Sequence, residues 1–433
     1  MKLKKITAMV LTAIMVVGCF TGCGKDEKEE VASTSGSVFD LLKQENDNCV
    51  ISLDFNYKET FSDEDTNETN SKGSVVLSLD SSKNMYSLDT IKIEGNEDSN
   101  FSIEKLISGS KDAIYLNVGS LMTSLLSEQT DSSMSSIGMM LQMVFKDVEY
   151  LKVDLPSQEM LSTKEVKDEF IKNLETAIKN AGFNFVASED GKTFTMKVTN
   201  VEGLVKIEKE LYNQIKASSD VYATYMESSK NNLTDENVKN YIGYMANDLF
   251  EEVAKYFEIE LTDSNKETLK TNIDKWLEEG VSVSTEQLTK EEAKKQIEES
   301  MDAELEALDY EYEDIKNMET TFVVKDTDEG MSITIEAKSE TTEGEKAEGT
   351  FDIAIIEGKA NISLPSESTD FKDIVGNVMA LLDGFGLFED VKTVLTGADE
   401  ETLNAFINAL FESSSDDIFE DDMEDIELIP YGA

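Results

Sequence analysis

The stretch "CVISLDFNYKETF", residues 49–61, decides the fold, because apolar and polar residues alternate along it. Ile51, Leu53, Phe55 and Tyr57 fall on one side of an extended chain, and the residues between them are mostly polar. Successive side chains of a strand point to opposite faces, so this alternation predicts a strand with one buried and one solvated face. Strands of this kind are typical of antiparallel sheets.

The same alternation recurs on both sides of a long helical stretch. "GSVVLSLD", "NMYSLDTIKIEG" and "NFSIEKLISG" precede it, and "METTFVVKD", "GMSITIEAKSE" and "GTFDIAIIEG" follow it. Short polar turns with Gly or Asn, each placed before an alternating strand, indicate hairpins at residues 79–90, 108–118, 188–198 and 326–337. The sequence therefore predicts an α+β fold with a curved antiparallel sheet, open like a half-barrel, that packs against helices.

Helical periodicity dominates the middle of the chain. The stretch "STKEVKDEFIKNLETAIKNAG", residues 162–182, places apolar side chains on one face and ends at Gly182, which is a good helix stop. From Val201 to about Tyr310 nearly every residue follows a helical pattern, which reads as an insertion in the sheet. Thr234, Thr262 and Thr289 are expected to cap helices there. Residues 290–308 are so polar that we expect this helix to pack through few residues and to project into solvent.

Two organisations fit this order of elements. In one, the strands form a single sheet that flanks the helical insertion. In the other, the chain holds two related halves, as indicated by the Leu-Pro-Ser sequence that occurs in both 150–160 and 360–370. The predicted ranges are a signal peptide at 1–22, a flexible tether at 23–37, a β-rich half with helices at 38–200, a helical insertion at 201–310, returning strands at 311–370, and helices with an acidic tail at 371–433.

The beginning of the sequence carries an export pattern. "MKLKK" places lysines ahead of "ITAMVLTAIMVVG", an uncharged apolar run that is too short to span a bilayer and long enough for the core of a secretory signal. The run ends in "VVGCFTGCGKDEKEE", residues 16–30, where each cysteine follows a glycine. This stretch resembles the lipobox of bacterial lipoproteins, in which a cysteine receives a diacylglycerol and the chain is cut just before it.

Two cysteines fit this lipobox. Val16 stands three residues before Cys19 and favours Cys19, but a cut there would leave Cys23 as an exposed thiol in an oxidising exterior. A cut before Cys23 removes Cys19 and leads directly into a charged tether. We therefore expect lipidation of Cys23, with Cys19 as the alternative, and a plain signal or membrane anchor as the remaining interpretation. The resemblance implies an exported protein that is lipid-anchored on the outer face of the cell membrane.

Charge restricts the partners. The chain has 90 acidic residues and a formal charge of -51 at pH 7, and all 39 basic residues are lysines. Nucleic acid needs basic patches and anionic lipid headgroups attract basic segments, so we expect no nucleic acid partner and no electrostatic docking on the membrane. Membrane contact is then expected from the lipid. Lysine without arginine indicates a low-GC genome, and the tether resembles those of Gram-positive lipoproteins.

Missing residue types restrict the chemistry. Without histidine the chain has no Ser-His-Asp or Cys-His catalysis and no histidine-ligated zinc site, and without arginine it lacks a bidentate carboxylate or phosphate clamp. We therefore predict a non-catalytic protein with no cofactor and no metal. Asp326, Asp328 and Glu336 are spaced almost as in a calcium loop, but a hairpin turn is favoured there. Cys49 is expected to be a buried small hydrophobe.

The layout of the elements supports a second resemblance. A tether, a short helix near "VFDLLKQ", long alternating strands and an interposed helix resemble the open half-barrel lipoproteins related to LolA and LppX, over roughly residues 38–181 and 320–364. This resemblance implies an apolar cavity for a lipid or another hydrophobic ligand. The candidate lining residues are Met134, Ile137, Met139, Met140, Met143 and Phe145, for which ordinary core packing is the alternative.

Two non-catalytic hypotheses of function follow, beside a third, an enzyme, which would need a constellation of carboxylates or lysines. In the first, the anchored half-barrel binds an apolar or amphiphilic ligand. In the second, the chain is an interaction or structural lipoprotein of the cell envelope, with the helical region as its docking surface and a protein partner that the sequence does not identify.

Overall fold

A computed structural model describes part of the chain in two compact units. Unit 1 comprises Met1–Lys111, Glu159–Ser229 and Leu288–Leu364, and unit 2 comprises Asp112–Gln158, Lys230–Gln287 and Pro365–Ala433. The described residues are 37–44, 46–61, 68–95, 100–127, 144–145, 147–154, 164–232, 251, 254–255, 260–279, 288–374 and 377.

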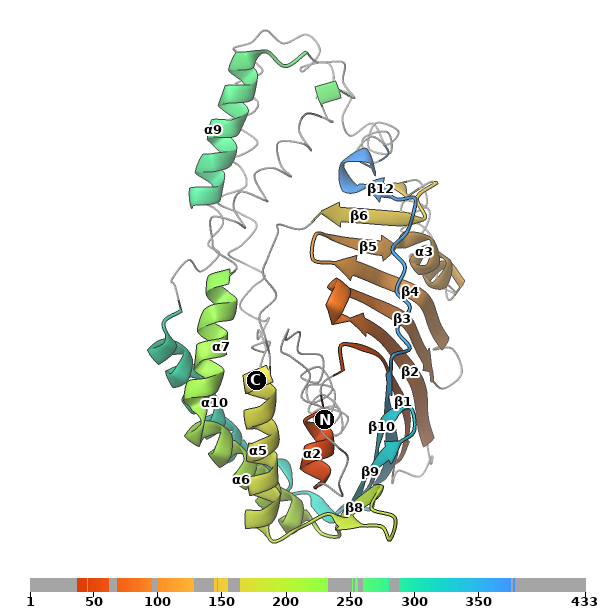
Figure 1. The fold of residues 1–433 in the computed structure, drawn as a ribbon, viewed down its shortest axis with the longest axis vertical. Helices are drawn as coiled ribbons and strands as arrows, with labels where there is room; N and C mark the ends of the chain where they lie inside the picture. Colours follow the sequence, from red (N-terminus) through yellow and green to blue (C-terminus); the bar gives the residue numbers. More distant parts are fainter. Residues whose placement is uncertain are drawn as a thin grey trace. The chain divides into compact units, whose positions relative to one another are not determined.

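Unit 1 is built on an antiparallel sheet. Its strands are β1 (Asn48–Thr60), β2 (Glu68–Asp80), β3 (Met85–Glu94), β4 (Asn100–Ser110), β7 (Val186–Ala187), β8 (Thr193–Val198), β9 (Ile315–Thr327), β10 (Gly330–Thr341) and β11 (Lys346–Glu357). Their order is β4-β3-β2-β1-β11-β10-β9-β8-β7, so strands from both sides of the helical stretch share one sheet. The interpretation of one sheet around a helical segment is confirmed. The sheet curves, and helices lie on its concave side (Figure 1).

Strand β1 lies in the middle of this sheet. It pairs with β2 along its whole length and with β11 from Cys49 to Thr60. Ile51, Leu53 and Tyr57 are buried, and Asp54 and Asn56 are exposed. The two-faced strand that the alternation predicted is thus confirmed.

Two hairpins show why the turns fall where the sequence placed them. Between β2 and β3 the turn η1 (Ser81–Lys83) closes on Asn84, which adopts the left-handed conformation with φ of 51°. Between β9 and β10, Gly330 has φ of 138°, and a Cβ there would lie 2.1 Å from the carbonyl oxygen of Ile355. Glycine is therefore required at 330. These hairpins and the β7–β8 hairpin confirm three of the predicted turns, and residues 108–118 span the boundary between the units.

Helices fill the concave face of the unit 1 sheet. Helix α2 (Val38–Leu42) buries four of its side chains in the same core as α5 (Lys164–Ala181), α6 (Val201–Ala217) and the inner face of the sheet. Core residues include Phe39, Leu41, Ile51, Ile171 and Ile353. Figure 1 shows α2 between α5 and the sheet. The concave side of unit 1 is accordingly packed with the protein's own side chains.

Helix α10 (Lys290–Glu311) extends this helical layer. It begins with a capping box in which Thr289 Oγ1 accepts from the backbone N–H of Glu292, as the sequence predicted. Ala293, Ile297 and Met301 are buried against a core cluster that also contains residues of α6 and α7 (Ser219–Asn232). Helix α10 thus packs through a few apolar residues at helical spacing, as predicted, and Glu291, Lys295 and Glu299 are exposed on it.

Unit 2 contains β5 (Ala113–Asn117), β6 (Tyr150–Asp154), β12 (Thr369–Asp370), α3 (Val118–Ser127), α9 (Asp263–Glu279) and the short helix η2 (Phe371–Ile374). Strands β5 and β6 are antiparallel, whereas β12 pairs with β6 in parallel through two residue pairs. Val118, Met122, Val148, Leu151 and Ile374 form a small core. The α+β prediction is confirmed, with this short parallel pair as a difference from an all-antiparallel sheet.

Candidate functional site

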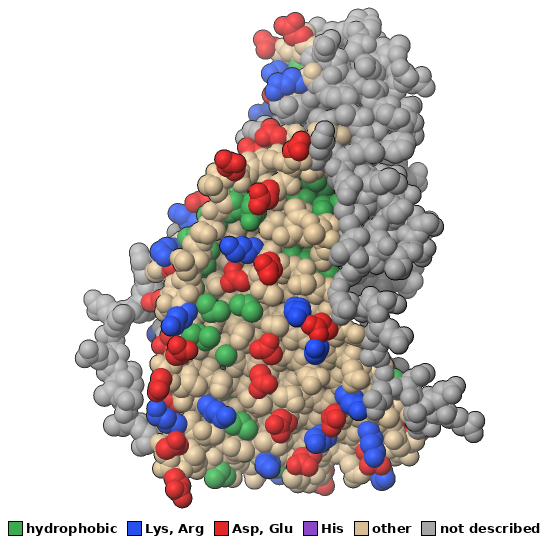
Figure 2. Space-filling view, turned by 90° about the vertical axis from the view of Figure 1, so that its right-hand side faces the viewer, with side chains coloured by type: hydrophobic (Ala, Val, Ile, Leu, Met, Phe, Trp, Pro, Cys, Tyr) green, Lys and Arg blue, Asp and Glu red, His purple; other side chains and the backbone are tan. Residues whose placement is uncertain are grey.

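A groove lies on the outer, convex face of the unit 1 sheet. Its volume is about 500 Å³, and it is open to solvent. The lining residues come from four neighbouring strands and are Asp54, Phe55, Asn56, Lys72, Gly73, Ser74, Lys92, Glu94, Thr350 and Asp352. Figure 2 shows this side of the protein, where lysines and acidic side chains are interspersed with few apolar groups. We call this recess the outer groove.

Two carboxylates in the lining of the outer groove stand opposite each other on neighbouring strands. Asp54 on β1 is the register partner of Asp352 on β11, and both side chains are exposed. Thr334 on β10 donates a hydrogen bond from Oγ1 to Asp352 Oδ1 at 2.6 Å. Like charges directly opposite each other destabilise a strand pair, so this pair makes the local potential negative at some expense of stability.

A compact ion group lines the other side of the outer groove. Glu94 on β3 lies 2.5 Å from the ammonium of Lys72 and 2.6 Å from that of Lys92. Hydrogen bonds from these two lysines lower the pKa of Glu94 to about 2. Glu94 thus pairs with both lysine ammonium groups. Asp54 and Asp352 lie opposite each other on the neighbouring strands β1 and β11. The groove offers donors and acceptors side by side, which suits binding of a polar partner.

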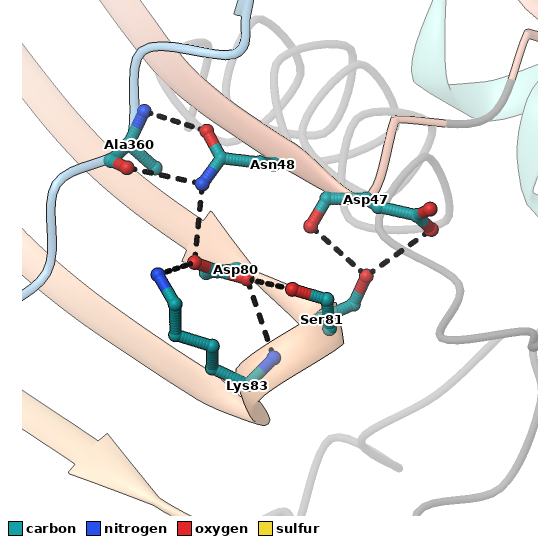
Figure 3. Close-up of polar contacts among 7 residues, drawn as sticks. Asp47, Asn48, Asp80, Ser81, Lys83 and Ala360 are labelled. Carbon is teal, nitrogen blue, oxygen red and sulfur yellow. Dashed lines mark hydrogen bonds and ion pairs between the residues drawn. The ribbon is translucent and has the colours of Figure 1, made fainter.

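A second polar group holds the beginning of β1. The side chain of Asn48 accepts a hydrogen bond from the backbone N–H of Ala360 at 2.9 Å and donates one to the carbonyl of Ala360 at 3.0 Å (Figure 3). Its Nδ2 also donates to Asp80 Oδ2 at 3.2 Å. The side chain of Asn48 therefore pairs with the segment after β11 as a backbone would. We call Asp47, Asn48, Asp80 and Ala360, with their hydrogen bonds, the β1 clamp.

Asp80 is the charged centre of the β1 clamp. Its side chain is 2% exposed and accepts from Lys83 Nζ at 2.6 Å and from Ser82 Oγ at 2.6 Å. Hydrogen bonds from Lys83, Ser82 and Asn48 lower the pKa of Asp80 to about 2, against the opposing effect of its burial. The carboxylate thereby fixes the turn after β2 to the start of β1.

A buried lysine holds the end of α2. Lys167 on α5 is 2% exposed, and its Nζ donates to the carbonyl oxygens of Gln44 at 2.8 Å and Lys43 at 3.4 Å. The last carbonyls of a helix lack partners within the helix, and a cation there is favourable. Lys167 therefore ties the segment that follows α2 to the long helix α5.

The predicted site residues fall mostly outside the described part of the chain. Cys19 and Cys23 lie outside it, as do Met134, Ile137, Met139, Met140 and Met143. Phe145 is described and packs, partly buried, against the small core of unit 2. Cys49 is 1% exposed, as expected, and burial raises the pKa of its thiol to about 11.

Sequence reasoning missed the outer groove and the buried Lys167. The pairing of Asp54 with Asp352 depends on the β1–β11 register, for which alternation gives no signal, and Lys167 lies in a helix whose other charges are solvated. No helix in the described ranges combines the length and apolar character needed to cross a membrane. The described side chains also bring together no group of three metal-ligating residues.

Comparisons with known proteins give no relative. No protein-family model, curated protein or solved structure matches the chain.

Proposed function

We propose that the chain is an exported, lipid-anchored protein of the cell envelope that acts by binding without catalysis, as an interaction or structural lipoprotein. One observation carries the choice between the two hypotheses. Helix α2, the first element after the expected tether, is buried in the concave face of the unit 1 sheet together with α5 and α6. These side chains fill the face that a half-barrel would offer to a ligand. We therefore expect unit 1 to bind its partner through an exposed surface.

The outer groove is the described surface that best suits this role. Its lining includes a pair of opposed carboxylates and two lysines around a glutamate. Such alternating charge favours a polar partner with basic groups placed near Asp54 and Asp352. Electrostatic complementarity of this kind gives selectivity more than raw affinity.

Site-specific crosslinking on intact cells tests the binding role. A photoreactive residue at Asn56, within the outer groove, should give one discrete crosslinked product. The same residue at Glu319, exposed on β9 outside the groove lining, should not give that product. Asp54→Lys should reduce the yield from position 56. A featureless smear from both positions, or the same product from both, would contradict the proposal.

Labelling with an acyl chain tests the anchor separately. Cys23→Ala should abolish incorporation of the labelled chain, and Cys19→Ala should leave it. Loss of label in Cys19→Ala alone would assign the anchor to Cys19 instead. Label retained in a protein with both substitutions would refute lipidation at this site.

The apolar-ligand hypothesis has its own test. Phe145, the described member of the candidate lining, packs against Val118, Met122 and Val148 in the manner of core, which favours the packing interpretation. Native mass spectrometry of the delipidated chain should therefore show no copurified lipid and no uptake of a fluorescent fatty acid. Stoichiometric retention of a lipid would favour the ligand-binding hypothesis over the one proposed.

A further inference from the structure

We propose that α2 and the β1 clamp form a two-stage mechanical junction between the membrane anchor and unit 1. Under load through the tether, α2 is released first, and extension then stops at Asn48. This inference rests on the proposed function, because an N-terminal anchor is what applies load to this end of the chain. The mechanical order itself can be measured without any lipid.

The first stage is weak because α2 is a short helix and is not hydrogen-bonded to a neighbouring strand as β1 is. A helix of five residues is not stable alone, so docking holds it in place. Val38, Phe39, Leu41 and Leu42 supply that docking by burial, and Phe39 meets the ring of Phe185 edge to face at 6.0 Å. Apolar contacts are non-directional and can break one side chain at a time as the chain is drawn out.

Lys167 adds a polar contact at the end of this segment. Its two hydrogen bonds go to the carbonyl oxygens of Lys43 and Gln44, which lie between α2 and β1. These bonds join the residues that follow α2 to α5. Release of the segment therefore requires the separation of Lys167 from these carbonyls.

The second stage is strong because many directional bonds must break together. The carbonyl of Asn48 accepts from Gly358 N–H at 2.7 Å, and that of Asp47 accepts from Ser81 N–H at 2.8 Å. The Asn48 side chain adds its contacts with Ala360 and Asp80. Beyond Asn48, β1 is held by ladders on both edges, whose hydrogen bonds run across the strand. A pull along β1 loads these bonds in parallel.

Release of α2 lengthens the connection between the membrane anchor and unit 1 while the unit 1 sheet stays folded. Residues 37–47 can extend to roughly 35–40 Å at 3.3–3.6 Å per residue. The anchored protein can then follow a partner away from the membrane while the outer groove keeps its shape. Without the second stage, the same load would pull β1 from the centre of the sheet.

Single-molecule pulling of the chain without its signal peptide and lipidated cysteine, residues 24–433, tests the order of events. One handle is attached at the N-terminus and the other at Glu343→Cys, an exposed position in the β10–β11 turn, so that β1 is sheared against β11. We expect a small extension step before the main rupture. A single rupture with no earlier step would overturn the proposal.

Two substitutions separate the stages. Phe39→Ala should shorten the lifetime of the first stage at constant force at least about tenfold, because it removes one of the buried side chains that dock α2. It should leave the main rupture unchanged. Asn48→Ala should lower the force of the main rupture and leave the first step unchanged. Equal effects of either substitution on both steps would refute a two-stage junction.

Matched controls guard against a general loss of stability. Ile297→Ala in α10 removes a buried side chain of unit 1 from a core cluster that contains neither α2 nor β1, and it should preserve the first step. Hydrogen exchange of the unaltered protein gives a second readout, in which α2 amides should exchange at least about tenfold faster than those of β1. Equal exchange rates would contradict the proposal. Absence of acyl labelling would refute the anchor and leave these steps measurable.

Discussion

Replacing Asp80 by Asn should remove a pH-dependent contribution to the stability of unit 1. The carboxylate is 2% exposed and accepts hydrogen bonds from the side chains of Lys83, Ser82 and Asn48. Asn keeps the shape but loses the charge, and its amide would direct a donor toward Lys83 or Asn48. Lowering of the Asp80 pKa from 3.8 to about 2 corresponds to roughly 2–3 kcal/mol at about 1.4 kcal/mol per unit.

Solvent screening lowers this figure. The side chain of Lys83, the strongest partner, is 62% exposed, so we expect the substitution to reduce the free energy of unfolding by about 1–2 kcal/mol at pH 7. Because the pKa is lowered in the folded state, the contribution is present above the unfolded-state pKa near 4. It is lost as the pH falls through about 2.

Urea unfolding of both proteins, followed by far-ultraviolet circular dichroism at pH 7, 4, 3 and 2, measures the difference. Every other carboxylate protonates in both proteins, so the difference between them isolates Asp80. We expect the gap to be constant from pH 7 to about pH 5 and to shrink between pH 4 and pH 2. A gap that stays constant down to pH 2 would refute the assignment of a charged, hydrogen-bonded Asp80.

Three further changes test other parts of the structure. Asp54→Asn should raise the urea midpoint at low salt by the equivalent of about 0.2–1 kcal/mol, because it relieves the repulsion with Asp352, and a lower midpoint would contradict that pairing. Gly330→Ala should lower the free energy of unfolding by more than about 2 kcal/mol in the same assay. Gly191→Ala is the control, because Gly191 also has a positive φ, 69°, but open space where a Cβ would lie, and it should lower that free energy by about 1 kcal/mol. Equal effects of the two substitutions would exclude the clash with Ile355. In a chain that begins after Cys23, the thiol of Cys49 should react with a disulfide reagent at pH 8 only as fast as the protein unfolds. The reason is that the thiol is buried and that its pKa is raised to about 11. Rapid reaction in the folded state would show that the thiol is accessible.

Local patterns predicted the local structure well. The alternation in 49–61 identified the buried face of β1, and the Thr-x-x-Glu pattern at Thr289 identified a helix start. Both signals depend on residues within one turn or strand, which the sequence displays directly. The polar composition of 290–308 indicated a helix that packs through few residues, and Ala293, Ile297 and Met301 form that narrow apolar stripe.

Pairing over long distances could not be predicted. Nothing in the alternation of β1 identifies β11 as its neighbour. The pairing of Asp54 with Asp352 and the outer groove could therefore not be predicted from the sequence. The burial of Lys167 depends on the carbonyls of Lys43 and Gln44, which belong to a distant segment. A lysine on a charged helix ordinarily indicates a solvated face, since the cost of burial is high without such partners.

The central position of β1 also sets the order in which the protein can fold. Ile51 pairs with Ile355, so the first strand of the chain needs a partner that is synthesised after the whole helical stretch. Strands β2, β3 and β4 can form hairpins early, but one edge of β1 stays open until β11 arrives. Open strand edges promote aggregation, and closing so long a loop is slow. If the chain is exported N-terminus first, as proposed, it would hold an unfinished sheet outside the membrane during most of its export, and the proposed lipid anchor would keep that intermediate at the surface.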